Sequence, residues 1–171
     1  MDTIIETVRL TLRPLCLADA EAVHGYSGDA GNTRYITGLP NAAIEETQAY
    51  LQWVSHEWCK VAPGYCGFAI MLGGRLIGEV AFGVEPEKTE ASIGWIIHRD
   101  YWNRGYATEA VAAVIDLCFN SLDIKTIIAS CDVDNTASRR VMQKLGMQLK
   151  HENEPWEYKD GRVSTGAVYS C

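Results

Sequence analysis

A short stretch in the middle of the chain, residues 101–110 (YWNRGYATEA), joins a strand-like run to a helical pattern. The first four N–H groups of a helix lack intrahelical partners, and with the helix dipole they attract phosphate. Gly105 and Ala107 leave room for a close approach, Thr108 adds a hydroxyl and Arg104 adds a positive charge. The same glycine would also suit a plain turn from strand to helix. The stretch therefore predicts either a phosphate cradle or a structural turn.

Other phosphate and metal motifs are missing from the sequence. It contains neither GxxxxGK[ST] nor GxGxxG, so we expect neither a P-loop nor a dinucleotide fingerprint. Its six cysteines include no CxxC pair, and its histidines are not paired at zinc spacing. We therefore expect no metal site, and reduced thiols of the kind found in cytoplasmic proteins.

Length and composition are typical of one globular domain spanning residues 1–171. Hydrophobic residues make up 47% of the chain and charged residues 22%. The formal net charge of -7 argues against nucleic acid or an anionic membrane as a partner. The N-terminus has an early acid and no long apolar core, so we expect no signal peptide. No run approaches the roughly 20 apolar residues of a membrane span. We expect a cytoplasmic protein.

The first part of the chain predicts one strand and two helices around a polar loop. Alternation places Val8, Leu10 and Leu12 on one face of the strand, and Asn41 is a candidate N-cap for the second helix. The predicted elements are a strand over 7–15, a helix over 17–28, a loop over 28–40 and a helix over 42–60. Arg34, Tyr35 and Ile36 lie near the middle of the loop, which makes it a candidate substrate wall. Arg34 and Tyr35 are the candidate substrate-binding residues.

The rest of the chain predicts a hairpin, further strands and two more helices. Gly73 and Gly74 mark a tight turn, and Gly146 ends the last helix. A β-branched run in the strand over 124–133 suggests burial on both faces. The predicted elements are strands on either side of the double glycine within 64–84, a turn over 86–90, a strand over 91–98, a helix over about 104–120, a strand over 124–133, a helix from Asn135 to Leu145 and two strands around 159–161.

These elements predict an α/β (α+β mixed) fold with a mixed sheet of about seven strands and about four helices. The hairpin and the strand after it should form an antiparallel meander. Parallel strands are needed only in the middle of the sheet, because only there does a helix connect one strand to the next.

Two quoted motifs carry a family resemblance, residues 91–111 (ASIGWIIHRDYWNRGYATEAV) and residues 132–147 (DVDNTASRRVMQKLGM). In this order the chain resembles the GCN5-related N-acetyltransferase (GNAT) superfamily, and within it the branch that acetylates the N-termini of ribosomal proteins. The resemblance extends over nearly the whole chain, from RLTLRPL (9–15) through LIGEVAF (76–82) to the final hairpin.

The resemblance implies acetyl-CoA as the cosubstrate and a splayed central pair of parallel strands that admits it. The pyrophosphate would lie on the amides of Asn103, Arg104, Gly105, Tyr106, Ala107 and Thr108. The pantetheine arm would run alongside the strand that ends at Ile97 and His98, and Asn135 would contact it. Dimers are common in the family, so a homodimer is possible.

The sequence departs from the family pattern at several positions. Asn103 stands where the turn usually has its first glycine, although asparagine tolerates a positive φ better than most residues. Trp102 replaces the glutamine or arginine of the general pattern, as is common in this branch. Met142 stands where other branches carry a tyrosine that protonates the departing thiolate, and methionine has no such proton. Met147 replaces a phenylalanine, which is a packing change.

Acetyl transfer to an amine needs a neutral nitrogen, a stabilised oxyanion and a proton for the leaving sulfur. Free amines are mostly protonated at neutral pH, since the reference pKa is about 8 for an α-amino group and about 10.4 for lysine. The family places Ser138 near the thioester, which makes it our candidate proton donor; a plain local role in the first helical turn is the alternative. A backbone N–H near Ile97 would serve the oxyanion.

The identity of the general base is the catalytic role that the sequence determines least. Glu79 in a central strand is our choice, and Glu90 and His98 are the other candidates, although each could be structural. Glu109 follows the glycine turn and is interpreted as a brace for it. Trp53 and Trp58 are plausible wall residues for the acceptor, although helical spacing also suits core tryptophans.

Three functions remain open at this point. The first is an N-acetyltransferase acting on a peptide N-terminus or a small amine by direct attack in a ternary complex. The second is a non-catalytic CoA-binding sensor or regulatory module, suggested by Asn103 and Met142. The third is a nucleotide-binding domain that uses the same glycine turn.

Overall fold

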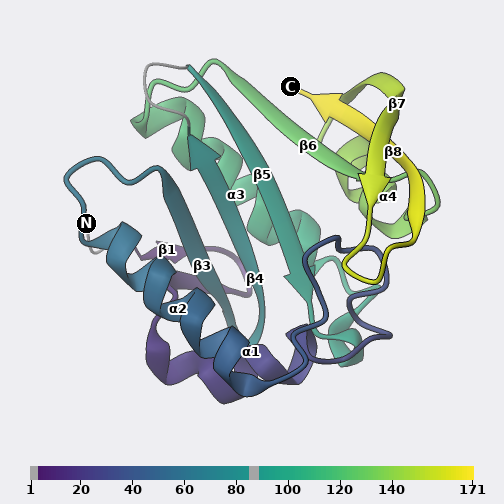
Figure 1. The fold of residues 1–171 in the computed structure, drawn as a ribbon. Coiled ribbons are helices and arrows are strands. Elements are labelled where there is room, and N and C mark those ends of the chain that lie inside the picture. Colours follow the sequence, from purple (N-terminus) through teal and green to yellow (C-terminus); the bar gives the residue numbers. More distant parts are fainter. Residues whose placement is uncertain (1–3, 85–88) are drawn as a thin grey trace.

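The computed structural model describes residues 4–84 and 89–171 (Figure 1). The predicted turn over 86–90 falls mostly outside these residues. The strands are β1 (Ile5–Glu6), β2 (Thr11–Pro14), β3 (Tyr65–Leu72), β4 (Arg75–Val84), β5 (Glu90–Ile97), β6 (Thr126–Asp132), β7 (Gln148–Glu157) and β8 (Val163–Ser170). The helices are α1 (Ala20–Ser27), α2 (Ile44–Trp58), α3 (Tyr106–Ser121) and α4 (Thr136–Lys144), with short 3-10 turns η1 (Leu17–Asp19) and η2 (Arg99–Tyr101).

All the strands join one mixed sheet in the order β1-β2-β3-β4-β5-β6-β8-β7. Figure 1 shows α1 and α2 on one face of the sheet and α3 on the other. The predicted meander is confirmed, because β3, β4 and β5 pair antiparallel in sequence. Gly73 and Gly74, at φ +54° and +82°, make the tight turn between β3 and β4. The mixed fold and the helices agree with the sequence, and the additional strand is the two-residue β1.

The pairing between β5 and β6 is parallel and short. It covers only Glu90 to Ser92 on β5 and Thr126 to Ile128 on β6. Beyond that point β5 continues to Ile97 and β6 to Asp132, and Figure 1 shows the two strands diverging from a common start. The expected splayed pair is therefore present.

The predicted burial of both faces of β6 is wrong. Ile127 and Ala129 are buried against the helices behind the sheet, but Ser130 is exposed and Ile128 is only half-buried. The physical reason is that α1 and α2 pack mainly on β3 and β4, so this face of β6 borders the cavity instead of a helix.

The N-terminal strand is shorter than its alternation predicts. Leu10 and Leu12 are buried, but Val8 is 95% exposed. Residues 7–10 form a turn, in which the Thr7 N–H donates to the Leu10 carbonyl over 2.9 Å and separates β1 from β2. Local hydrogen bonding by a threonine side chain therefore overrides the apolar alternation.

Asn41 does not cap α2, the second helix of the chain. The N-cap of α2 is Ala43, and no side chain caps it. Asn41 instead donates to the Thr47 hydroxyl over 2.8 Å, and Thr47 also lies 3.2 Å from the Ser27 hydroxyl. The asparagine therefore ties the long loop to α1 and α2.

The tip of the β7–β8 hairpin holds the same loop from the other side. The Lys159 N–H donates to the Thr37 carbonyl over 2.9 Å, and the Lys159 ammonium pairs with Glu46 of α2 over 2.6 Å. Gly161 at φ +83° makes the predicted turn of this hairpin. The second half of the loop over 28–43 is thus held by α1 and α2 on one side and by the β7–β8 hairpin on the other.

The core lies between the sheet and its helices. Val111, Val114 and Cys118 of α3 are buried behind the sheet, and Leu51 and Val54 of α2 are buried in front of it. Cys66, Cys118 and Cys131 are buried free thiols, and Cys16, Cys59 and Cys171 are exposed free thiols. Among the described residues no helix has the length and apolar character needed to cross a bilayer.

Met142 of α4 is completely buried. Substitution by alanine should lower the free energy of unfolding by about 2 to 5 kcal/mol, because the surrounding core only partly fills the space left. Urea unfolding at unchanged m-value measures this loss. Gln143→Ala, on the exposed side of the same turn, serves as the control; an equal effect in both variants would contradict the packing role.

Candidate active site

The glycine turn before α3 has the geometry of an anion cradle. Gly105 is the N-cap at φ +81°, in the left-handed region, and no side chain caps the helix. Asn103 is also left-handed at φ +59°, the conformation that asparagine tolerates best after glycine. The first N–H groups of α3, from Tyr106 onward, therefore have no side-chain partner at the N-cap and lie at the positive end of the dipole.

Arg9 and Glu109 hold this turn from outside. The Glu109 carboxylate accepts from the Arg9 backbone N–H over 2.8 Å and from the Arg9 Nε over 2.7 Å, and from the Thr7 hydroxyl over 2.6 Å. Arg9 Nη1 donates to the Arg104 carbonyl over 3.0 Å, and the guanidinium lies over the Tyr106 ring. These contacts agree with the interpretation of Glu109 as a brace. Because Arg9 is about 100 residues distant in sequence, no local pattern in the sequence reveals its part.

The end of β5 presents backbone groups toward the splay. The His98 N–H donates to Ile77 on the β4 side over 2.8 Å, so by alternation Ile97 faces the opposite edge. The Ile97 carbonyl there accepts from Asn32 Nδ2 over 3.2 Å and from the Trp102 indole over 2.7 Å. Asn32 Oδ1 also accepts from the Arg99 N–H over 2.6 Å. Buried Asn32 thus joins the long loop to the end of β5, a role that the sequence did not reveal.

A cavity of about 680 Å³ opens where β5 and β6 part. Its lining residues come from β3, β4, β5 and β6, from α1 and α2, and from the long loop. The lining residues are Val23, Tyr26, Ser27, Ile36, Gly38, Leu39, Asn41, Tyr50, Tyr65, Glu79, Ala81, Gly83, Ser92, Ile93, Gly94, Trp95, Ile96, Ile128 and Ser130. The volume is typical of a small-molecule site.

Glu79 is the carboxylic acid among the residues that line this cavity. It is 7% exposed and accepts a hydrogen bond from the Tyr50 hydroxyl, which lies 2.9 Å from the Tyr65 hydroxyl. Burial raises the pKa of Glu79 to about 7, although the tyrosine hydroxyls oppose the shift by stabilising the carboxylate. A carboxyl group with this pKa can accept a proton near neutral pH, as a general base must.

The three tyrosines around Glu79 are also perturbed. Burial and the neighbouring Glu79 carboxylate raise the pKa values of Tyr26, Tyr50 and Tyr65 above the ordinary phenol value, so all three stay neutral donors. The Tyr26 hydroxyl is buried and has no hydrogen-bond partner of ordinary geometry among the described residues, although it lies near enough to Glu79 to help lower the pKa of that acid. None of these tyrosines had been singled out from the sequence.

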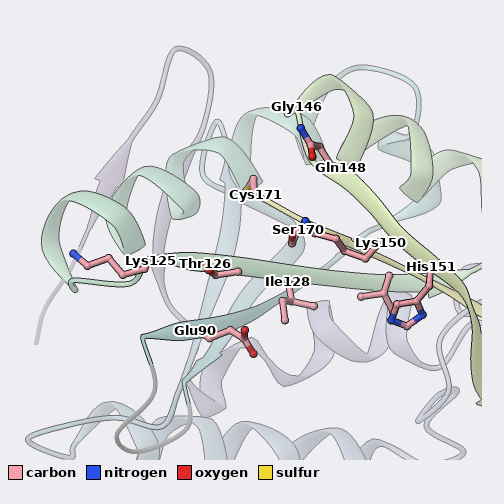
Figure 2. A pocket seen from close by; sticks show the side chains of 11 residues that line it. Glu90, Lys125, Thr126, Ile128, Gly146, Gln148, Lys150, His151, Ser170 and Cys171 are labelled. Atoms are coloured by element: carbon pink, nitrogen blue, oxygen red, sulfur yellow. The ribbon is translucent and has the colours of Figure 1, made fainter.

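The other base candidates lie elsewhere. Glu90 is at the opposite end of β5 from Ile97 and lines a separate, polar cavity of about 640 Å³ with Lys125, Lys150 and His151 (Figure 2). His98 Nδ1 accepts from the Asp100 N–H over 3.2 Å, so this nitrogen serves as the cap of a short turn. Neither residue is among those that line the cavity around Glu79.

Of the residues expected to form the substrate wall, only Ile36 lines the cavity. Arg34 is exposed and lies over the neighbouring Tyr35 ring, and neither lines the cavity. Gly38 and Leu39 of the same loop line the cavity beside Ile36. Trp58 is buried in the core, where its indole donates to the Gly67 carbonyl.

Trp53 lies outside the cavity and is 46% exposed. It packs on the tyrosine pair from the solvent side, and its ring centroid lies 4.8 Å from that of Tyr65. This indole therefore shields the pair without facing the cavity.

Asn135 and Ser138 occupy the first turn of α4, immediately after β6. Asn135 is the N-cap, and its Oδ1 accepts from the Ser138 N–H over 3.1 Å, which confirms the predicted cap. Ser138 is half-buried and is not among the residues that line the cavity. No cluster of potential metal ligands occurs among residues 4–84 and 89–171.

Known proteins share both the sequence pattern and the fold. A model of the acetyltransferase (GNAT) domain matches residues 9–148. The uncharacterized N-acetyltransferase YoaA of Bacillus subtilis is 31% identical, over 99% of this chain and 97% of its own length. A GNAT-family acetyltransferase structure from Bacillus anthracis has a TM-score of 0.84 at 27% identity, covering 99% of this chain and 98% of that chain.

A further structural likeness concerns the fold alone. RimL, a ribosomal L7/L12 alpha-N-protein acetyltransferase solved in complex with coenzyme A, has a TM-score of 0.86 at 21% identity, covering 99% of this chain and 97% of its own.

The family match extends over most of the chain and includes the glycine turn, the splayed strands and the start of α4. The chain belongs to the GNAT acetyltransferase family, and it is an N-acetyltransferase.

Proposed function

We propose that the protein transfers the acetyl group of acetyl-CoA to a primary amine by direct attack within a ternary complex. The observation that carries this proposal is the position of Glu79. This buried acid, with a pKa raised to about 7, lines a cavity that opens between the splayed strands β5 and β6. A base in that place can take the proton that an attacking ammonium must lose.

The residues present fit acetyl-CoA, which supplies an acetyl group activated as a thioester. Asn103, Arg104, Gly105, Tyr106, Ala107 and Thr108 would hold its pyrophosphate. The left-handed Gly105 and the N-terminus of α3, without a side-chain cap, support this assignment. The β6-facing edge of β5 near Ile97 and His98 would hold the pantetheine arm, together with Asn135. RimL, which shares the fold, has been solved in complex with coenzyme A.

Glu79 prepares the acceptor amine. The amine enters as an ammonium ion, and the Glu79 carboxylate accepts one of its protons while Tyr50 donates to the same carboxylate. The tyrosine hydrogen bond keeps the carboxylate charged often enough at neutral pH to act, because it opposes the effect of burial. The nitrogen lone pair is then free to attack.

Two further groups complete the reaction. A backbone N–H on the β6-facing edge of β5 near Ile97 stabilises the charge that develops on the carbonyl oxygen, without a side chain. Ser138, in the first turn of α4, gives its hydroxyl proton to the departing sulfur and regains one from the adduct nitrogen, which loses its second proton as the amide forms. Holding both substrates together contributes further, since proximity can supply about 7 to 11 kcal/mol in favourable cases.

Binding and turnover with a panel of amines test the function. Coenzyme A and acetyl-CoA should each raise the melting temperature, because both bind the native state, and ATP and NAD should not. Thiol release from acetyl-CoA should then depend on an added primary amine. Stabilisation by coenzyme A without release on any amine would instead indicate the regulatory CoA-binding module, and stabilisation by ATP or NAD alone a nucleotide-binding domain.

Ser138→Ala tests the proton donor. The variant should lower kcat by about 100-fold with little change in KM, because the hydroxyl acts on the leaving group rather than in ground-state binding. Thr136→Ala removes an exposed hydroxyl from the same helical turn and should leave kcat unchanged. Full turnover by Ser138→Ala would show that another group, or water, protonates the sulfur.

A further inference from the structure

The cavity around Glu79 has walls that are mainly aromatic and aliphatic. Tyr26, Tyr50, Tyr65 and Trp95 supply aromatic surface, and the loop and the strands add aliphatic side chains. Glu79 is the only carboxylate among the lining residues, and no lysine, arginine or histidine of the described chain is among them. The site therefore offers one negative charge and no positive charge to a ligand.

Most polar side chains in the walls already have partners. Asn41 donates to Thr47 over 2.8 Å, and Ser27 lies 3.2 Å from the same Thr47 hydroxyl. The Ser92 hydroxyl lies 3.5 Å from the Gly83 carbonyl. These contacts leave few side-chain groups for the amides of a peptide, whose buried N–H and C=O groups each need a hydrogen bond. The unpaired main-chain edge of β5 is taken by the pantetheine arm in the transfer proposed above.

One buried polar atom in the cavity lacks a partner. The Tyr26 hydroxyl is on a side chain that is 1% exposed, and it lies beside Glu79 without a hydrogen bond of ordinary geometry among the described residues. An ammonium group has three N–H donors, which the Glu79 carboxylate and the Tyr26 oxygen can accept, while the aromatic rings attract its positive charge. The polar contacts that these side chains offer to a ligand are thus concentrated at Glu79 and Tyr26.

We propose that the acceptor is a small primary amine whose substituent is uncharged and mainly apolar, as in an alkylamine or arylalkylamine. This inference rests on the acetyl transfer proposed above. The amino group binds at Glu79 and Tyr26, and the substituent lies against the aromatic and aliphatic walls. A carboxylate or phosphate beside the amino group would be buried near Glu79 with no cation to pair with, so amines that carry one are excluded.

Three acceptors that share a benzyl group isolate the effect of an unpaired carboxylate on acetyl transfer. 2-Phenylethylamine, phenylalaninamide and phenylalanine differ only in a hydrogen, an amide or a carboxylate beside the amino group. Because leaving one charge buried and unpaired costs about 3 to 5 kcal/mol, kcat/KM should fall by at least about 100-fold from phenylethylamine to phenylalanine. Phenylalaninamide should fall between them, by about 10-fold, because its amide finds few partners. Equal use of phenylalanine, or preferred use of an unblocked tripeptide, would overturn the inference.

A substitution on the loop provides the converse test. Ile36→Arg places a cation in the half-buried wall, and it should raise kcat/KM for phenylalanine relative to phenylethylamine by about 10-fold or more through a charge-assisted pair. Ile36→Gln is the matched uncharged control and should leave the ratio near its original value. An unchanged ratio in a folded Ile36→Arg variant would contradict the role of the missing cation.

Calorimetry separates the two proposals. Phenylethylamine should bind the protein without acetyl-CoA, and phenylalanine should bind at least about 100-fold more weakly. If no amine releases thiol from acetyl-CoA but this difference in affinity is found, the acetyl transfer is wrong and the amine site stands. If thiol is released but the two amines bind equally, the amine class is wrong and acetyl transfer stands.

Discussion

Glu79→Gln should lower kcat by about 100- to 10,000-fold, because glutamine keeps the size of the side chain but cannot accept a proton from the amine. The wild-type rate should rise with pH through about 7, where Glu79 loses its proton, and the variant should lack this inflection. Rate profiles from pH 5.5 to 9 at saturating acetyl-CoA measure both effects. A variant that keeps the inflection would assign the base to another group.

Tyr50→Phe supplies a graded control for this assignment. The Tyr50 hydroxyl lowers the pKa of Glu79, so its removal should move the inflection to higher pH while activity persists. A merely structural disturbance would lower the rate without moving the inflection.

The same carboxyl group should make stability depend on pH in the opposite direction. Its pKa is about 7 in the folded protein against an ordinary value of 4.5, so its favourable contribution is complete below 4.5 and is lost as pH rises through 7. The difference corresponds to about 3 kcal/mol. Glu79→Gln should therefore be more stable than the wild type at pH 8, as measured by urea unfolding, although it is far less active.

Gly105→Ala should weaken coenzyme A binding by about 10- to 100-fold. The left-handed φ of +81° disfavours any side chain, and a relaxed turn would withdraw charge-assisted bonds from the pyrophosphate, each of which contributes about 1.5 to 3 kcal/mol. Calorimetric titration measures the affinity. Pantetheine, which lacks the pyrophosphate, should bind both proteins equally.

Gly74→Ala is the matched control, because Gly74 has nearly the same φ of +82° in the β3–β4 turn. Gly74→Ala should lower the free energy of unfolding about as much as Gly105→Ala does, without changing the affinity for coenzyme A. Equal weakening in both variants would indicate general strain rather than an anion site at the start of α3.

Features that depend on neighbouring residues could be predicted from the sequence. The double glycine between β3 and β4, the Asn135 cap and the left-handed turn at Gly105 each follow from short-range backbone chemistry. The parallel pair also follows, because a helix connects β5 to β6. The family motifs add the splay, which periodicity alone does not reveal.

Features that depend on distant contacts could not be predicted. Arg9 reaches the turn before α3 across the sheet edge, and Asn32 bridges the loop to β5. The tyrosines around Glu79 come from three different elements, and each alone reads as ordinary core. In the loop, Arg34, Tyr35 and Ile36 are expected to form a substrate wall, but only Ile36 of these three lines the cavity. Val8 and Asn41 were misplaced because side-chain hydrogen bonds nearby outweighed simple patterns.

The early end of the β5–β6 ladder has a consequence for how tightly a guest can be held. A ligand that enters the gap between β5 and β6 beyond Ser92 and Ile128 meets main-chain groups that are not paired between these two strands. No hydrogen bond between β5 and β6 therefore has to break when it binds. Preorganisation of this kind raises affinity by reducing the reorganisation that binding would otherwise require. A ligand bound between the diverging parts of β5 and β6 would therefore take the place of a neighbouring strand along the unpaired edge of β5.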